Sequence, residues 1–268
     1  MTQISAKDVM ALRNRTGLAM MECKKALGEA GGDIDQAEDL LRKKLKGKME
    51  TKLDRAAGEG RIGIAVGDGG AAILELRAET DFTAKNDNFI NAANKLAEAA
   101  LGAGAGDVAT TDDMTAIIDD IRISTGENIS IARAHKVDGE GTFGSYIHHD
   151  GKTGVLIHAT GDVSQETLRQ IGMHVTAAVP RPLGVSADDI PADKVERERK
   201  FRIDQAVESG KPQEIAEKMV EGGMKKFFAE VALLEQPYVI DPSKTVREIL
   251  GDGGDVKAFF RWAVGEEA

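Results

Sequence analysis

Cysteine is almost absent from this chain of 268 residues, because Cys23 is its only cysteine. A single cysteine forms neither an intramolecular disulfide nor a cage of several thiolates around a metal ion. Aromatic residues are also scarce, at 4% of the sequence, so aliphatic side chains and alanine must fill the core. The hydrophobic content of 41% is nevertheless enough for a packed core, which argues against wholesale disorder.

Positive charge is in deficit, and long hydrophobic runs are missing. The 35 Lys and Arg residues face 45 Asp and Glu residues, which gives a formal net charge of -10. This acidity disfavours broad attraction to phosphate backbones, so we expect no direct nucleic-acid partner. No apolar run approaches the roughly 20 residues that span a bilayer, and the first residues form neither a basic leader nor an apolar segment. We therefore expect a cytoplasmic protein without a membrane partner, whose partner is a protein or a small molecule.

The first 54 residues have the spacing of three short helices. Ser5 is a good N-cap, Gly17 fits a helix stop, and Asp33 can cap a later helix. Apolar residues recur at helical spacing, namely Val9 and Leu12, then Met20, Met21, Cys23 and Leu27, then Ile34, Ala37, Leu40 and Leu41. This pattern predicts a small helical module with residues 43–52 as an exposed basic tail or linker. Pattern alone assigns Cys23 and the two methionines to the core, with an adaptable docking surface as the alternative for the methionines.

The rest of the chain contains a faint repeat of pattern rather than of identity. In each copy two runs of strand-forming residues flank a glycine-containing turn, and an amphipathic helical pattern follows. Strands are predicted at residues 62–66, 72–76 and 129–137 for the first copy and at 143–147, 155–157 and 256–264 for the second, with helices at 89–100, 111–124 and 164–178 and a loop at 102–106. Two small antiparallel sheets with helices on one side give an α+β core.

Between residues 193 and 234 the pattern changes to long charged helices. The first segment is marked by Val195, Ile203 and Val207, and a break follows at residues 209–212. The second segment is marked by Ile215, Met219, Val220, Phe227, Val231 and Leu234. A short Gly-Pro break between two helices predicts an antiparallel helical hairpin.

Two segments suggest ligand chemistry, and each has a plainer interpretation. Gly151-Lys152-Thr153 resembles the end of a phosphate-binding loop, but Tyr146 stands where that motif needs its first glycine, so a simple turn is favoured. His148 and His149 are adjacent, and on a strand neighbouring side chains point to opposite faces, so they are not expected to share a metal ion. Since no other metal-ligand spacing occurs, neither a metal site nor a cofactor is predicted.

Residues 79–86 join the first predicted hairpin to the helix that follows it. Thr80 or Asp81 can cap that helix, and Phe82 can pack against it as a hydrophobic staple, which pattern alone favours. The alternative is a wedge, in which an acidic and an aromatic side chain at a sheet-to-helix corner insert into a partner. A wedge requires an exposed Phe82, and a fully buried Phe82 would count against it.

Ordered blocks across nearly the whole chain resemble the elongation factor Ts family. They are Leu12-Arg13 with Thr16-Gly17, Met20 to Leu27, Thr80-Asp81-Phe82 with Ala84-Lys85-Asn86, Gly126-Glu127-Asn128-Ile129, Gly172 to Val175, Gly210-Lys211-Pro212 with residues 215–222, and Pro242 to Val246. The sequence departs from the family at Thr83, where Val is usual, and at Gly223, where Arg is common. If residue 223 is helical, the glycine should weaken that helix by about 1 kcal/mol.

The resemblance implies a domain organisation and a function. Residues 1–54 would form a three-helix module like ubiquitin-associated domains, residues 55–140 and 141–268 would form two similar α+β subdomains, and a helical hairpin would be inserted at about 193–234. The family catalyses GDP release from elongation factor Tu so that GTP can replace it. The resemblance thus implies a guanine-nucleotide exchange factor without covalent chemistry and without a cofactor.

Functional residues follow from the same resemblance. Thr80, Asp81, Phe82 and Thr83 would form a tip that dislocates magnesium in the partner. Contacts with elongation factor Tu are implied for Leu12, Arg13, Thr16, Gly17, Met20, Met21, His148 and His149. Two alternatives stay open, a binding module without exchange activity and a small-molecule enzyme that uses the Gly151-Lys152-Thr153 turn.

Overall fold

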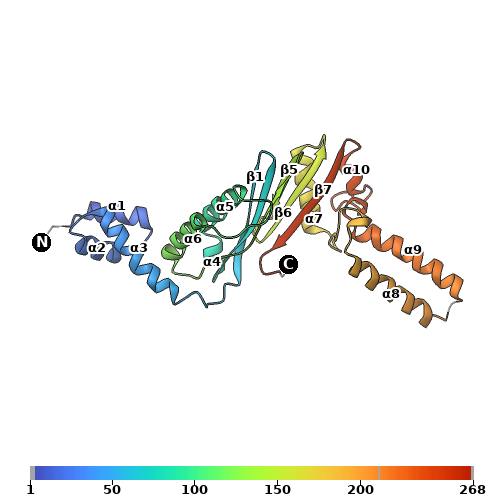
Figure 1. Ribbon diagram of the computed structural model, residues 1–268, viewed down its shortest axis with the longest axis horizontal. Helices are drawn as coiled ribbons and strands as arrows, with labels where there is room; N and C mark the ends of the chain where they lie inside the picture. Colours follow the sequence, from blue (N-terminus) through green and yellow to red (C-terminus); the bar gives the residue numbers. More distant parts are fainter. Residues whose placement is uncertain (1–3, 211, 267–268) are drawn as a thin grey trace. The chain divides into compact units, whose positions relative to one another are not determined.

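A computed structural model describes residues 4–210 and 212–266, and its helices and sheets confirm the α+β class (Figure 1). The N-terminal part consists of α1 (Ala6–Thr16), α2 (Met20–Glu29) and α3 (Ile34–Glu50). The predicted caps are confirmed, because the Ser5 hydroxyl accepts the Asp8 N–H at 3.1 Å and the Asp33 carboxylate accepts the Gln36 N–H at 2.9 Å. Gly17 ends α1 with a φ of 71°, in the left-handed region that favours glycine.

The helical core of this part is aliphatic, as the low aromatic content requires. Leu12, Cys23, Leu27 and Ala37 are fully buried together, so the assignment of Cys23 to the core is confirmed. The basic stretch predicted as a tail is the end of α3 and the start of the segment after it.

The first sheet contains four strands in the order β1-β2-β4-β3, namely β1 (Glu59–Gly67), β2 (Gly70–Ala78), β3 (Gly106–Asp107) and β4 (Ser130–Asp138). The three predicted strands are confirmed as β1, β2 and β4. The predicted loop at residues 102–106 was wrong at its end, where Gly106 begins β3. A two-residue strand carries no alternation that a sequence pattern could reveal.

Helices α4 (Asp81–Ala84), α5 (Asp87–Leu101) and α6 (Asp112–Thr125) belong to the same half of the chain (Figure 1). Helix α5 lies so close to β1 that a Cβ atom on Gly63 would meet the Ala93 carbonyl oxygen at 2.6 Å. The alanines on the inner face of α5 and this glycine therefore allow helix and sheet to pack closely, and Phe89 is buried on the same face of the helix.

The second sheet is antiparallel, with the order β5-β6-β7. Its strands are β5 (Thr142–Ile147), β6 (Thr153–Gly161) and β7 (Gly254–Ala263). Helix α7 (Gln165–Ala177) packs on it and is capped by Ser164, as predicted. The short elements η1 (Ala187–Asp189), η2 (Leu233–Glu235) and α10 (Val246–Leu250) complete this part, and η2 and α10 contribute side chains to the same hydrophobic core.

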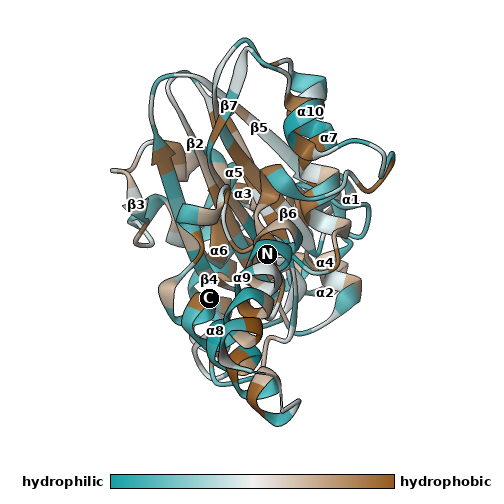
Figure 2. Cartoon of the chain, turned by 90° about the vertical axis from the view of Figure 1, so that its right-hand side faces the viewer, coloured by the Kyte–Doolittle hydropathy of each residue, from teal (hydrophilic) through white to brown (hydrophobic). Residues whose placement is uncertain are grey.

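Helices α8 (Ala192–Glu208) and α9 (Gln213–Val231) form the predicted hairpin, but their contact face differs from the predicted one. Val195, Val220, Phe227 and Val231 are packed as expected, whereas Ile203, Val207, Ile215 and Met219 are exposed. The inner face of α8 repeats through Val195, Glu198, Arg202 and Ala206, so half of it is charged, and hydrophobic spacing after Val195 selected the wrong face. Figure 2 shows hydrophobic and hydrophilic segments alternating along both helices. Lys211, in the predicted break, lies outside the described residues.

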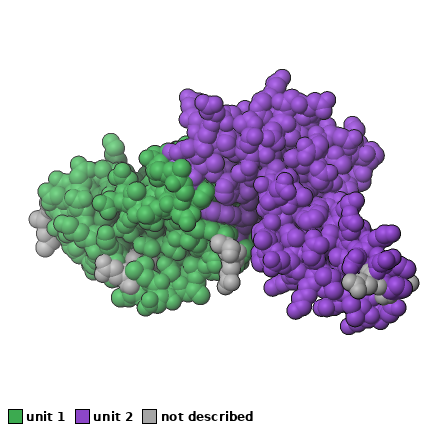
Figure 3. Space-filling view, turned by 45° about the vertical axis from the view of Figure 1, so that its right-hand side comes forward, with its two compact units in different colours: residues 1–63, 73–135, 264–268 green, residues 64–72, 136–263 purple. Residues whose placement is uncertain are grey.

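Two compact units divide the chain (Figure 3). One comprises residues 1–63, 73–135 and 264–268, and the other comprises residues 64–72 and 136–263. The division into domains at residues 54 and 140 stays a proposal. Within residues 4–210 and 212–266, no helix is long and apolar enough to cross a membrane.

Candidate functional site

Residues 80–83, hereafter the tip, form the start of the one-turn helix α4 directly after β2. Thr80 is the N-cap, and its hydroxyl accepts the Thr83 N–H at 3.3 Å, so the predicted capping role is confirmed. Phe82 is 83% exposed, so its interpretation as a packed staple is wrong. A Phe side chain left in water forgoes about 1.5–3 kcal/mol of burial free energy, which becomes available if a partner covers it.

Asp81 lies beside Phe82 and carries the negative charge of the tip. Its carboxylate pairs with the Lys85 ammonium group at 2.7 Å, one helical turn further on. Both side chains are well exposed, and exposed pairs at this spacing contribute only about 0.3–0.5 kcal/mol. The Asp81 carboxylate can therefore leave Lys85 and bind a group on a partner at little cost in free energy.

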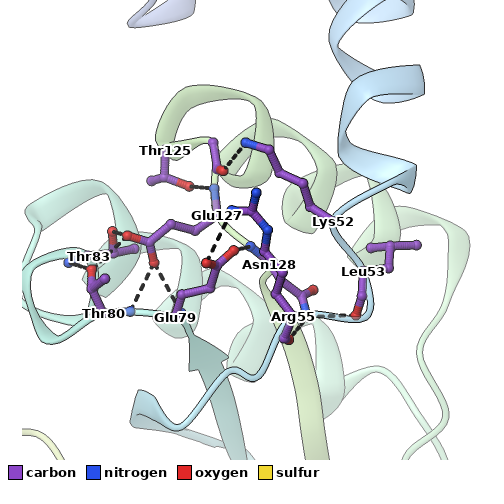
Figure 4. A network of polar contacts seen from close by, with 10 residues as sticks. Lys52, Leu53, Arg55, Glu79, Thr80, Thr83, Thr125, Glu127 and Asn128 are labelled. Atoms are coloured by element: carbon purple, nitrogen blue, oxygen red, sulfur yellow. Dashed lines mark hydrogen bonds and ion pairs between the residues drawn. The ribbon is translucent and has the colours of Figure 1, made fainter.

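Glu127 lies beneath the tip and accepts four hydrogen bonds from residues 79–83 (Figure 4). Its Oε2 atom accepts the N–H groups of Glu79 and Thr80, both at 3.1 Å. Its Oε1 atom accepts the hydroxyls of Thr80 at 2.6 Å and Thr83 at 2.7 Å. One carboxylate thus holds both ends of the tip.

The neighbouring Asn128 continues this network toward the segment that follows α3. The Glu79 carboxylate accepts the Asn128 N–H at 2.7 Å, and the Asn128 amide donates to the carbonyls of Leu53 and Arg55, both at 2.8 Å (Figure 4). Residues 53–55, the turn at 127–128 and the tip are therefore joined by hydrogen bonds.

The N-terminal candidates divide into buried and exposed residues. Leu12 is fully buried, so a direct contact between Leu12 and a partner is excluded in this conformation. The Thr16 hydroxyl donates to the Leu12 carbonyl at 2.8 Å and lies 3.7 Å from the Cys23 sulfur, and Gly17 ends α1. Leu12, Thr16 and Gly17 thus support the helical module, while Arg13 is exposed.

The assignment of Met20 and Met21 to the core by pattern alone was wrong. Met20 is 45% exposed and Met21 is 75% exposed. Met20 lies at the open first turn of α2, and Met21 shares its face with the exposed Lys24 and Lys25, whereas Cys23 and residues one turn later face inward. The two methionines therefore present an apolar, adaptable surface to solvent.

The His148-His149 pair lies in the turn after β5. The expectation that the two side chains point apart was wrong, because β5 ends at Ile147 and the two rings lie edge to face with centroids 4.3 Å apart. His148 is also 3.1 Å from the Tyr146 hydroxyl. Within the part of the chain that the structure describes, no group of three or more His, Cys, Asp or Glu side chains is arranged to hold a metal ion.

The Gly151-Lys152-Thr153 segment closes the turn between β5 and β6, as predicted. The Gly151 N–H donates to the His148 carbonyl at 2.8 Å, and the Lys152 N–H donates to the Asp150 carboxylate at 2.9 Å. These two N–H groups serve the turn itself, whereas a phosphate-binding loop directs them at its ligand.

Comparison with known proteins assigns the family. The family model described as elongation factor TS matches residues 79–266, beginning at the residue before the tip. The chain belongs to the elongation factor Ts family. It is similar to elongation factor Ts of Vibrio cholerae, with 44% identity over 268 residues that cover 98% of this chain and 92% of the relative. Identity to elongation factor Ts of Pasteurella multocida is 45%, covering 99% and 93%, and to that of Alcanivorax borkumensis 43%, covering 96% and 93%.

Membership of the elongation factor Ts family makes the chain a translation elongation factor. The structure shows what the two residues that differ from the usual family sequence, Thr83 and Gly223, contact. The hydroxyl of Thr83, where Val is usual, donates to Glu127, so the change adds a hydrogen bond under the tip. Gly223, where Arg is common, faces Arg202 of α8, whose Nη1 atom would lie 2.6 Å from a Cβ atom at this position. The glycine therefore makes room for a side chain of the opposite helix.

The contact between Glu127 and the tip was not predicted from the sequence. Glu127 belongs to the block Gly126-Glu127-Asn128-Ile129 that resembles the family, but no role was assigned to it. Its contacts with the tip join residues 44 to 48 positions apart, and hydrophobic periodicity carries no information about such contacts.

Proposed function

We propose that this elongation factor Ts chain is a guanine-nucleotide exchange factor that promotes GDP release from elongation factor Tu. The observation that carries the proposal is the exposed Phe82 on a capped, hydrogen-bonded tip. An apolar ring held in water in a defined position stores binding free energy that a partner can release by covering it.

The tip acts on the magnesium and phosphate site of the partner. Magnesium bridges the nucleotide phosphates to the GTPase and contributes much of the nucleotide's affinity. Phe82 wedges between side chains near that site, and the Asp81 carboxylate helps to draw the magnesium environment apart. Thr80 and Thr83 hold these two residues in place through their hydrogen bonds.

No covalent step is needed, because exchange follows from linkage. A factor that binds the nucleotide-free GTPase more tightly than the GDP form must weaken GDP binding by the same factor. A coupling free energy of about 3 kcal/mol weakens the nucleotide roughly 150-fold. GTP then rebinds and displaces the factor.

Other surfaces hold the partner while the tip acts. Arg13, Met20 and Met21 dock on the GTPase domain, and the turn at His148-His149 contacts a more distant domain of Tu. Leu12, Thr16 and Gly17 act indirectly by keeping the docking helices in place. A factor that allows Tu to replace GDP with GTP acts where translation takes place, so a cytoplasmic location is part of the proposal.

The test compares two exposed phenylalanines in an assay of labelled GDP release from Tu. Phe82→Ala should lower the acceleration at least tenfold, because about 1.5–3 kcal/mol of burial free energy is lost from the wedge. Phe201→Ala is the matched control, since Phe201 is 59% exposed on α8 and has no part in the proposed wedge. Both variants should unfold at the same temperature as the intact protein, because neither side chain is in the core.

Equal acceleration by the Phe82→Ala variant and the intact protein would exclude the wedge. Binding of Tu with no change in the GDP release rate would favour a binding module without exchange activity. Nucleotide binding by the isolated chain would favour the enzyme alternative.

A further inference from the structure

We infer that Glu127 is the positioning residue that holds the tip in the conformation required for nucleotide release, an inference that rests on the proposed function. Glu127 accepts two backbone N–H groups and two hydroxyls from residues 79–83, and so uses both carboxylate oxygens. Backbone N–H groups next to a helix start have no partner within the helix, so an external acceptor decides their direction.

Apart from Glu127, the tip is held by the burial of Thr83 and by the backbone hydrogen bonds of α4, from the Ala84 N–H to the Thr80 carbonyl and from the Lys85 N–H to the Asp81 carbonyl. Helix α4 contains only four residues, and isolated helices shorter than about 12 residues are marginal in water. Phe82 is exposed and anchors nothing, and the Asp81–Lys85 pair is exposed and weak. The Thr80 cap and the Glu127 contacts therefore add to this short helical turn the side-chain hydrogen bonds that fix where it begins.

Glu127 is itself held in place from both sides. Gly126, with a φ of 73°, ends α6, and the Thr125 hydroxyl accepts the Glu127 N–H at 3.4 Å. On the other side Asn128 is tied to the carbonyls of Leu53 and Arg55. The carboxylate is thus presented from a fixed turn, so it can impose an orientation on the tip.

Positioning of the tip by Glu127 predicts a change in exchange kinetics that a general contribution of Glu127 to folding stability would not produce. If the tip samples many conformations, the competent fraction falls and the maximal exchange rate falls with it. The concentration of factor at half-maximal rate depends mainly on the docking surface around Arg13, Met20 and Met21, which Glu127 does not touch. Removing Glu127 should therefore lower the maximal rate and leave the half-saturating concentration nearly unchanged.

The experiment measures GDP release from Tu over a range of concentrations of the full chain. Glu127→Ala should lower the maximal rate about tenfold or more, with less than about a threefold change in half-saturation. Glu127→Gln should recover most of the rate, because its amide oxygen can accept the two N–H groups while its amide nitrogen donates to the two threonine hydroxyls. Glu98→Ala, at an exposed glutamate of α5, is the matched control and should behave as the intact protein.

Amide hydrogen exchange gives a second readout that does not depend on activity. Exchange of the Glu79 and Thr80 N–H groups should become about tenfold faster in Glu127→Ala and stay near the intact level in Glu127→Gln. If Glu127→Ala does not fold, Thr80→Val replaces it, because this nearly isosteric change removes one Glu127 contact and the cap. Thr80→Val should also lower the maximal rate more than it changes half-saturation.

An intact protein that accelerates release, together with equally active Glu127→Ala and Thr80→Val variants, would overturn the role of Glu127 and leave the exchange function standing. Inactivity of the intact protein would instead overturn the exchange function, and the inference with it. A loss that appears only as weaker half-saturation would assign Glu127 to docking and would also overturn the inference.

Discussion

At the scale of single residues, the hydrogen-bond partners of the buried His174 in α7 determine which nitrogen of its neutral imidazole carries the proton. The Val239 N–H donates to its Nδ1 atom at 3.3 Å, and its Nε2 atom lies 2.9 Å from the Gln236 side-chain oxygen. The Gln236 amide nitrogen already donates to the carbonyls of Pro180 and Glu230, so the oxygen is the end that faces His174. The imidazole proton therefore resides on Nε2, and Nδ1 is an acceptor.

This residue predicts a loss of stability on acidification. Burial lowers the pKa of His174 below its ordinary value of 6.5, and the hydrogen bond to Gln236 opposes that shift. Because the folded pKa lies below the unfolded one, the unfolded chain binds more protons between them. The neutral His174 therefore contributes its full stability above pH 6.5, and this contribution is lost as the pH falls through 6.5 toward the folded pKa.

Urea unfolding at several pH values between about 7.5 and about 5.5 measures this effect. His174→Gln should lose part of the pH dependence of the unfolding free energy, whereas His149→Gln, at an exposed histidine, should keep it. An identical pH dependence in all three proteins would show that His174 is not responsible.

At the scale of elements, two adjacent glycines of α9 offer a matched comparison. A Cβ atom on Gly222 would meet no other atom within 4 Å, whereas one on Gly223 would lie 2.6 Å from the Arg202 guanidinium group. Gly222→Ala should stabilise the helical hairpin by about 1 kcal/mol, the difference in helix propensity. Gly223→Ala should gain clearly less, because Arg202 must move and disturb its 2.7 Å ion pair with Glu198.

Amide hydrogen exchange within α8 and α9 reports the opening free energy of the hairpin and checks this prediction. A larger gain for Gly223→Ala than for Gly222→Ala would contradict the packing of Arg202 against Gly223.

Elements with local signals were predictable from the sequence. Ser5, Thr80 and Ser164 are caps whose side chains bond within three residues, and the turns of both β-hairpins contain glycines. The inner face of α8 was not predictable, because Glu198 and Arg202 occupy it and place Ile203 and Val207 in solvent. His148 and His149 were misplaced because the end of β5 sets their directions, and strand ends have weak sequence signals.

At the scale of the whole molecule, docking and nucleotide release should be separable. Met20 and Met21 are exposed on α2, and replacing both with serine should change the unfolding free energy by no more than about 0.5 kcal/mol. The double variant should raise the half-saturating concentration for exchange about tenfold, because apolar contact area is lost from docking. Its maximal rate should remain that of the intact protein.

A concentration series of GDP release rates distinguishes this behaviour from that of Phe82→Ala. A lower maximal rate with unchanged half-saturation in the methionine variant would show that α2 acts in release and not in docking.

The candidate site was only partly predictable from the sequence, because some of its residues are neighbours in the chain and others meet only in the folded protein. The tip was found because its residues are contiguous in a block that resembles the family. Glu127 was not assigned, because it meets the tip only after residues 79–83 and 127 are brought together by the fold. The same resemblance implied a contact between Leu12 and the partner, although Leu12 is fully buried and supports its exposed neighbours.

The time course of labelled GDP release from Tu, with about one intact chain for every ten Tu molecules, tests the central claim most directly. With excess unlabelled nucleotide present, we expect all of the labelled GDP to be released far faster than from Tu alone, because one exchange factor serves many Tu molecules in turn. A release rate equal to that of Tu alone, with the chain folded and present, would contradict it.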